Sequence, residues 1–121
     1  MSKTLLLAAG CLIAILMATP AEAQPLSVTI TGPTSVLIPC GCGNVGWTAN
    51  PSGGSGTYVL YAWTLNGSAA GTNSPNLSQQ FCNFSSEPII NLVNVAVTVT
   101  DSNGREASDT HATSVSLQGC G

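Results

Sequence analysis

Hydrophobic and polar residues alternate with a period of two along much of the chain, and no stretch shows a convincing helical period. Because successive side chains of a β-strand point to opposite faces, this alternation predicts strands with one buried face. The cleanest example is 93–100, in which every second residue is valine. Further strands are expected over 26–30, 45–49 and 59–65, and from near Glu106 to Leu117.

Turn-forming residues separate these segments. The segment 50–56 is rich in Gly and Ser, Asn66-Gly67 is typical of a tight turn, and 101–104 (Asp-Ser-Asn-Gly) predicts a hairpin. One more strand is expected over 76–84, whereas the rest of 68–91 carries little pattern. Many short strands with frequent turns predict an all-β fold, a single antiparallel β-sandwich of about seven strands.

The first residues follow a different pattern. Lys3 precedes an apolar run from Leu5 to Met17, and Ala21-Glu22-Ala23 supplies small residues around a cleavage point. This is the three-part pattern of a secretory signal peptide, so we expect residues 1–23 to be removed and residues 24–121 to form one domain. The run is shorter than the roughly 20 residues of a membrane-spanning helix. No integral membrane anchor is therefore expected in the mature chain.

A lipoprotein is the alternative interpretation of this segment. Residues 7–11, Leu-Ala-Ala-Gly-Cys, are similar to a bacterial lipobox, in which Cys11 would carry the lipid. The apolar stretch before Cys11 is short for a signal core, and the run continues well past it. We therefore expect a secreted protein, extracellular or periplasmic.

The cysteines of the mature chain number four, which favours two disulfides in an oxidising compartment. Cys40 and Cys42 are one residue apart, so a bond between them would strain the backbone. Two pairings remain open: Cys40–Cys120 with Cys42–Cys82, or Cys40–Cys82 with Cys42–Cys120. A zinc site is a poorer interpretation, because Cys-x-Cys with the single distant His111 departs from the usual ligand spacing.

Charge is scarce. Arg105 is the only basic residue after residue 23, and the whole chain has a formal net charge of −3. One positive charge cannot form the basic surface that nucleic acid or an anionic membrane requires. We therefore expect no nucleic-acid partner.

The acidic residues gather only around one hairpin, where Asp101, Glu106 and Asp109 form a weak calcium candidate. Calcium takes six to eight oxygen ligands, and Arg105 lies in the middle of this group. A solvated turn in which Asp101 bonds turn amides is the favoured interpretation, so no metal or other cofactor is expected.

His111 is the only histidine. A catalytic base needs a nucleophile and an orienting partner, and the chain has no Gly-x-Ser-x-Gly elbow. We expect a partly buried, hydrogen-bonded structural histidine and a protein that is not an enzyme.

Two tryptophans are expected in the core. Trp63 shares one face of its strand with Val59, Tyr61 and Leu65, and Trp47 shares a face with Val45 and Ala49. The alternating valines of the cleanest strand complete the expected core: Val95, Val97 and Val99.

Three blocks of sequence carry a family resemblance. Gly-Gly-x-Gly-x-Tyr ends 48–58, Tyr-x-Trp opens 61–67, and Val-x-Val-Thr-Asp-x-Asn-Gly ends 95–104. In this order and spacing they resemble bacterial immunoglobulin-like domains, and more narrowly the polycystic-kidney-disease-type (PKD-type) domains of secreted and cell-surface proteins. The resemblance covers about residues 26–118 and implies an immunoglobulin-like sandwich.

The resemblance also favours one disulfide pairing. In the family's topology the segment around Cys40 ends near Cys120, and Cys42 opens a strand beside the one that carries Cys82. It therefore implies Cys40–Cys120 with Cys42–Cys82, although the cysteines are not a general feature of the family.

For function we expect a secreted, non-catalytic binding or structural module that serves adhesion, the matrix or protein–protein interaction. Its partner would be a protein or polysaccharide at the cell surface or in the matrix. The alternative is a carbohydrate-binding module, whose ligand contacts would be Tyr58 and Phe81, with Phe84 or an outward-turned Trp47. A small hydrolase or inhibitor that depends on His111 is the remote alternative.

Overall fold

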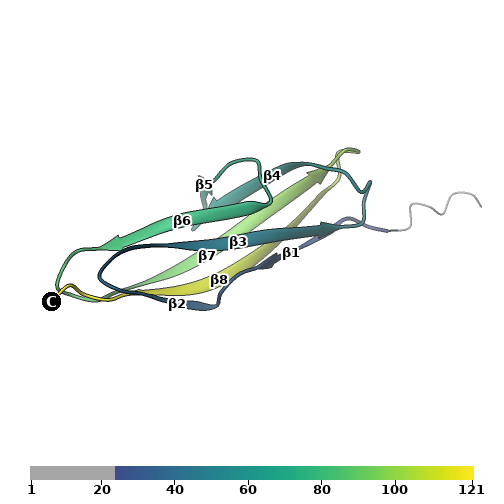
Figure 1. Cartoon of the computed structure of the whole chain (residues 1–121). Coiled ribbons are helices and arrows are strands. Elements are labelled where there is room, and N and C mark those ends of the chain that lie inside the picture. The colour runs from purple at the N-terminus through teal and green to yellow at the C-terminus, as the bar shows by residue number, and fades with distance from the viewer. Residues whose placement is uncertain (1–23) are drawn as a thin grey trace, which may run out of the picture.

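The computed structural model describes residues 24–121. The expected signal peptide and Cys11 lie outside these residues. Within 24–121 the chain is all-β, with eight strands and no helix, and it forms two sheets (Figure 1). The predicted all-β fold is confirmed. No helix of the described residues is long and apolar enough to cross a membrane.

The strands follow one another with short connections. Their bounds are β1 Ser27–Thr31, β2 Ser35–Ile38, β3 Gly41–Ser52, β4 Tyr58–Leu65, β5 Ser68–Ala70, β6 Asn76–Asn83, β7 Ile89–Asp101 and β8 Glu106–Leu117.

One sheet has three strands in the order β1-β3-β6, and the other has five in the order β2-β8-β7-β4-β5. The predicted antiparallel pairing is wrong for β2 and β8, which pair in parallel, and all other neighbouring strands are antiparallel. The chain thus leaves the first sheet after β1, joins the edge of the second as β2, and returns to the first as β3.

The core lies between the two sheets and consists of the inward residues of the alternating strands. Val95 and Val99 are fully buried, and Trp47 and Trp63 are each 2% exposed. Tyr61 is half-buried and packs against this cluster. The other buried hydrophobic residues are Val28, Ile30, Ile38, Val45, Ala49, Leu77, Val93, Val97, Val115 and Leu117.

The prediction that Val59 lies on the buried face of β4 is wrong. The register of β4 against β7 shifts between Tyr58 and Leu60, as at a β-bulge. This irregularity leaves Val59 51% exposed, while Trp63 stays buried. Val59 therefore does not share the buried face of Trp63.

Two further details differ from the sequence prediction. The strands number eight rather than about seven, because β2 and β5 are short and lack an alternating pattern. The predicted loop over 50–56 begins inside β3, which continues to Ser52. The tight turn is as predicted: Asn66 and Gly67 have φ angles of 50° and 88°, as such a turn requires.

Two disulfides close one end of the molecule, Cys40–Cys120 and Cys42–Cys82. Cys42 and Cys82 are cross-strand partners in β3 and β6. Cys40 joins the β2–β3 connection to the tail after β8, and Figure 1 shows the C-terminus at this end. These are the pairs that the resemblance favours, and two disulfides suit an oxidising extracellular or periplasmic environment.

Candidate functional site

Asp101 is a buried turn residue. Its Oδ1 atom accepts hydrogen bonds from the amides of Asn103 and Arg105, both at 2.9 Å, and Oδ2 accepts one from the amide of Ser55 at 3.0 Å. The carboxylate thus connects the β7–β8 hairpin to the Gly-rich loop before β4. This is the turn-bonding role expected for Asp101.

Burial and hydrogen bonding act in opposite directions on the pKa of Asp101. Desolvation raises it, because burial disfavours the charged form. The amides of Arg105, Ser55 and Asn103, helped by the charge of Arg105, outweigh this effect, so the pKa lies below its ordinary value. The carboxylate is therefore held ionised by the fold.

The three acidic residues of the calcium candidate do not converge. Asp101 is occupied by backbone amides, Glu106 is exposed, and Asp109 accepts a hydrogen bond from the amide of Ile30 in the other sheet at 2.8 Å. Within residues 24–121, no group of three or more His, Cys, Asp or Glu side chains is arranged to hold a metal ion.

His111 takes part in a hydrogen-bonded chain between the sheets. Its Nε2 atom lies 3.0 Å from the carbonyl oxygen of Pro33. A carbonyl only accepts, so Nε2 carries the proton. The same oxygen accepts a bond from the hydroxyl of Thr113 at 2.6 Å, and that hydroxyl accepts one from Trp47 Nε1 at 3.0 Å. These contacts give His111 a structural role.

The aromatic residues considered for sugar binding lie apart. Tyr58 pairs with Asp101 near one end of the sandwich, and its hydroxyl donates to Gly53 O at 2.9 Å. Phe81 lies beside Cys82 near the disulfide end. Both are half-buried against the core, and Trp47 points inward. Phe84 is 74% exposed and directly follows the last residue of β6.

The large aliphatic side chains with the highest exposed fractions lie instead on the outer face of the five-stranded sheet. Leu37 on β2 and Ile90 on β7 flank Ser116 of β8 in one cross-strand row. Leu92, two residues beyond Ile90, pairs with Ser114. Leu37, Ile90 and Leu92 are 63%, 67% and 73% exposed, and we refer to these three residues as the apolar patch.

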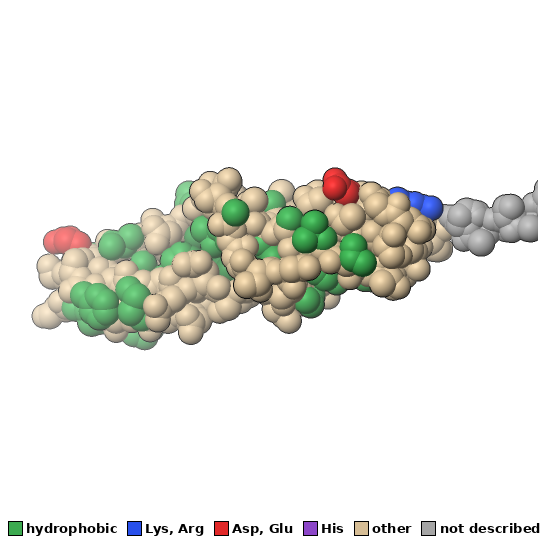
Figure 2. Space-filling model, turned by 90° about the horizontal axis from the view of Figure 1, so that it is seen from above, with side chains coloured by type: hydrophobic (Ala, Val, Ile, Leu, Met, Phe, Trp, Pro, Cys, Tyr) green, Lys and Arg blue, Asp and Glu red, His purple; other side chains and the backbone are tan. Residues whose placement is uncertain are grey.

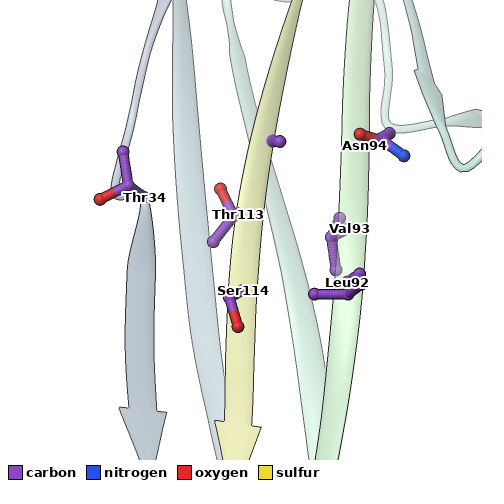
Figure 3. Close-up of a pocket in the computed structure, with 7 residues that line it drawn as sticks. Thr34, Leu92, Val93, Asn94, Thr113 and Ser114 are labelled. Atoms are coloured by element: carbon purple, nitrogen blue, oxygen red, sulfur yellow. The ribbon is translucent and has the colours of Figure 1, made fainter.

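A hollow of about 280 Å³ adjoins the apolar patch (Figure 3). In the close-up Leu92 extends from β7 toward β8, beside Ser114, and Thr34 lies on the far side of β8. No titratable side chain lines it; the lining residues are Thr34, Leu92, Val93, Asn94, Ala112, Thr113 and Ser114. The lining of the hollow is thus apolar or neutral.

Sequence reasoning did not single out the apolar patch. A signal was present in the sequence: the inward valines of β7 place Ile90 and Leu92 on the outward face of the strand.

The rest of the surface also carries little charge. On the face shown in Figure 2, charged side chains occupy only isolated places.

A scan against protein-family models and a search of the curated proteins both find no match to this chain.

Proposed function

We propose that this chain is a secreted, non-catalytic binding module that contacts a protein at the cell surface or in the matrix through the apolar patch. The observation that carries the proposal is the patch itself. Three large aliphatic side chains stand more than half exposed on β2 and β7, and between them the intervening strand β8 presents only the small side chains of Ser114 and Ser116. Clustered apolar exposure on a soluble domain marks a contact surface.

The strand order supports an immunoglobulin-like frame for this module. The orders β1-β3-β6 and β8-β7-β4 have the connectivity of the two sheets of an immunoglobulin sandwich. The early switch of the chain from β1 to β2 adds an edge strand to the second sheet. Such a frame holds β2, β7 and β8 rigidly, so the patch is preorganised for binding.

Secretion is supported by the two disulfides together with the signal-peptide pattern of residues 1–23. A protein partner is favoured over a polysaccharide because Tyr58 and Phe81 are half-buried at different places, and sugar platforms need exposed, coplanar aromatic rings.

The energetics follow from burial of the patch. Covering a leucine or isoleucine side chain contributes about 1.5–3 kcal/mol, so the three residues dominate a contact of ordinary size. Few charges are present to form ion pairs, so binding should depend weakly on salt.

The test is a retention assay with the oxidised protein on matrix extract, isolated cell surfaces and insoluble polysaccharides. The test variant is Leu92→Ser, and the matched control is Leu60→Ser, which removes another exposed leucine from β4. We expect a protein partner to be retained by the natural chain and by the control, and lost by Leu92→Ser. Retention on a polysaccharide, or equal retention of both variants, would overturn the proposal.

A further inference from the structure

Each sheet has two outermost strands, and three of these four are short or have an outward backbone group that is hydrogen-bonded to a side chain. Edge strands present unpaired backbone groups that invite another strand. On β1 the amide of Ile30 is occupied by the carboxylate of Asp109 at 2.8 Å. The four-residue strand β2 lies between Pro33 and Pro39, which cannot donate a ladder hydrogen bond.

The edge at β4 and β5 is closed by a side chain. β5 has only three residues. Beyond it, the side-chain amide of Asn73 makes the hydrogen bonds to β4 that a neighbouring strand would make. Asn73 Oδ1 accepts from the amide of Tyr61 at 2.7 Å, and Nδ2 donates to Val59 O at 3.1 Å. Two outward backbone groups of β4 are therefore satisfied by this one side chain.

The fourth edge strand, β6, is longer, and only two of its outward backbone groups are hydrogen-bonded to nearby side chains. It runs for eight residues, Asn-Leu-Ser-Gln-Gln-Phe-Cys-Asn, with no charged residue and no proline. It forms the border of the three-stranded sheet, beside β3 (Figure 1). Edge strands are commonly blunted by charge, proline or short length, and β6 is the longest of the four.

Two local hydrogen bonds show which backbone groups of β6 face outward. The backbone amide of Asn76 donates to Ser74 Oγ at 3.1 Å, and the backbone carbonyl of Gln80 accepts from Gln79 Nε2 at 3.2 Å. The backbone N–H and C=O groups of the even-numbered residues of β6 therefore point away from β3. The side chains of Ser78, Gln80 and Cys82 are exposed as well. Among the described residues, no hydrogen bond outside the β3 ladder involves these three amides.

We propose that a second copy of this chain occupies this edge, with β6 pairing antiparallel to β6 of the other copy. Pairing of a strand with itself about a two-fold axis brings identical residues close together, so any charge on the strand would repel its copy. β6 carries none, and the whole chain carries a net charge of only −3. The strand is thus compatible with itself.

The symmetry of the pairing decides the form of the assembly. Because both copies use the same strand, the contact is isologous and closes as a two-fold dimer rather than growing into a fibre. The product is a continuous six-stranded sheet in the order β1-β3-β6-β6-β3-β1. The apolar patch lies on the other sheet and takes no part, so this inference stands apart from the proposed function.

The first measurement is amide hydrogen exchange of the oxidised protein across a concentration series, together with its sedimentation. On dimerisation the amides of Ser78, Gln80 and Cys82 should become protected. Those of Leu77, Gln79 and Phe81, which face β3, should be protected at every concentration. A chain that stays monomeric throughout the series, or a dimer that leaves the first three amides unprotected, would overturn the proposal.

Two variants locate the contact. Gln80→Lys places like charges at the pairing and should raise the dimer dissociation constant at least about tenfold. Ser78→Pro removes an outward amide and should do the same. If Ser78→Pro fails to fold, the dimer dissociation constant of Gln80→Lys alone tests the β6 contact.

The controls are Thr110→Lys, an equal charge on an exposed position of β8, and Leu92→Ser in the apolar patch. Both should dimerise like the natural chain. Equal weakening by Gln80→Lys and Thr110→Lys would contradict the β6 contact.

Discussion

Trp47 and Thr113 are joined across the two sheets by a hydrogen bond of 3.0 Å, although they lie 66 residues apart in the sequence. The Thr113 hydroxyl accepts from the indole and donates to Pro33 O at 2.6 Å, so it uses both of its hydrogen-bonding roles. Both side chains are buried. A satisfied polar pair of this kind fixes the orientation of the indole inside an otherwise apolar core.

Replacement of Thr113 by valine should destabilise the fold. Thr113→Val keeps the shape of the side chain but leaves the Trp47 indole N–H without a partner, which costs about 1–3 kcal/mol. The free energy of unfolding from urea titration measures the effect. The control is Thr110→Val, an exposed position on the same strand, which should stay within about 0.5 kcal/mol of the natural chain. Equal effects would show that the buried hydrogen bond contributes nothing.

Replacement of Gly32 by alanine should also be destabilising. A Cβ atom at Gly32 would lie 2.4 Å from Cδ1 of Trp47, closer than two carbon atoms can approach. The indole is buried and hydrogen-bonded, so the strain is expected to reach about 1–3 kcal/mol. Gly46→Ala is the matched control, since its new methyl group would meet only Leu77 O at 3.6 Å. A Gly32→Ala protein as stable as the control would mean that the indole moves freely.

The two disulfides should contribute unequally. Removing either pair by double serine substitution should cost about 2–5 kcal/mol. The bonds span 80 residues for Cys40–Cys120 and 40 for Cys42–Cys82. A doubled loop adds about 0.6 kcal/mol of closure entropy, so loss of Cys40–Cys120 should be the larger of the two. Urea titration of both double variants gives the comparison. The reverse order would mean that native contacts, and not loop length, set the contributions.

Stability should fall in acid because of Asp101. The fold lowers the pKa of this carboxyl, so the unfolded chain binds the proton more readily than the folded chain does. The contribution is fully present above the unfolded pKa of about 4 and is lost as the pH falls through the lower folded value. Asp101→Asn should therefore lower stability at neutral pH and flatten the acid limb of a urea-midpoint profile. Glu106→Gln, at an exposed carboxyl, should keep that limb; a profile unchanged by Asp101→Asn would contradict the assignment.

The sequence predicted the parts of the fold that local pattern controls. The valines of 93–99 alternate because β7 has one buried face, and the Asn66-Gly67 turn follows from two left-handed backbone positions. β2 and β5 were missed since strands of three or four residues leave no period to detect. The irregularity that turns Val59 outward is a property of strand pairing and has no local signal.

The polar residues that hold the sandwich together were harder to foresee. Asn83 is 4% exposed; its Nδ2 donates to Glu87 O at 2.8 Å and Gln118 O at 3.2 Å, and its Oδ1 accepts from Ser85 N at 3.0 Å. Asn73 closes the edge of β4. In sequence both look like ordinary surface asparagines. Ser85 and Glu87 are sequence neighbours of Asn83, but Gln118 reaches Asn83, and Val59 and Tyr61 reach Asn73, only through the tertiary fold.

The Cys40–Cys120 bond also determines how the molecule carries tension. Gln24 lies beside Gly54, near the end opposite the C-terminus, so a pull between Gln24 and Gly121 acts along the long axis (Figure 1). Residues 41–119 lie inside the covalent loop that this bond closes, so the covalent path between Gln24 and Gly121 bypasses them. The strands on this covalent path are β1 and β2, and each residue of a fully extended chain spans at most about 3.6 Å. Under force β1 and β2 would detach first, and the part of the sandwich closed by the Cys40–Cys120 bond would not lengthen.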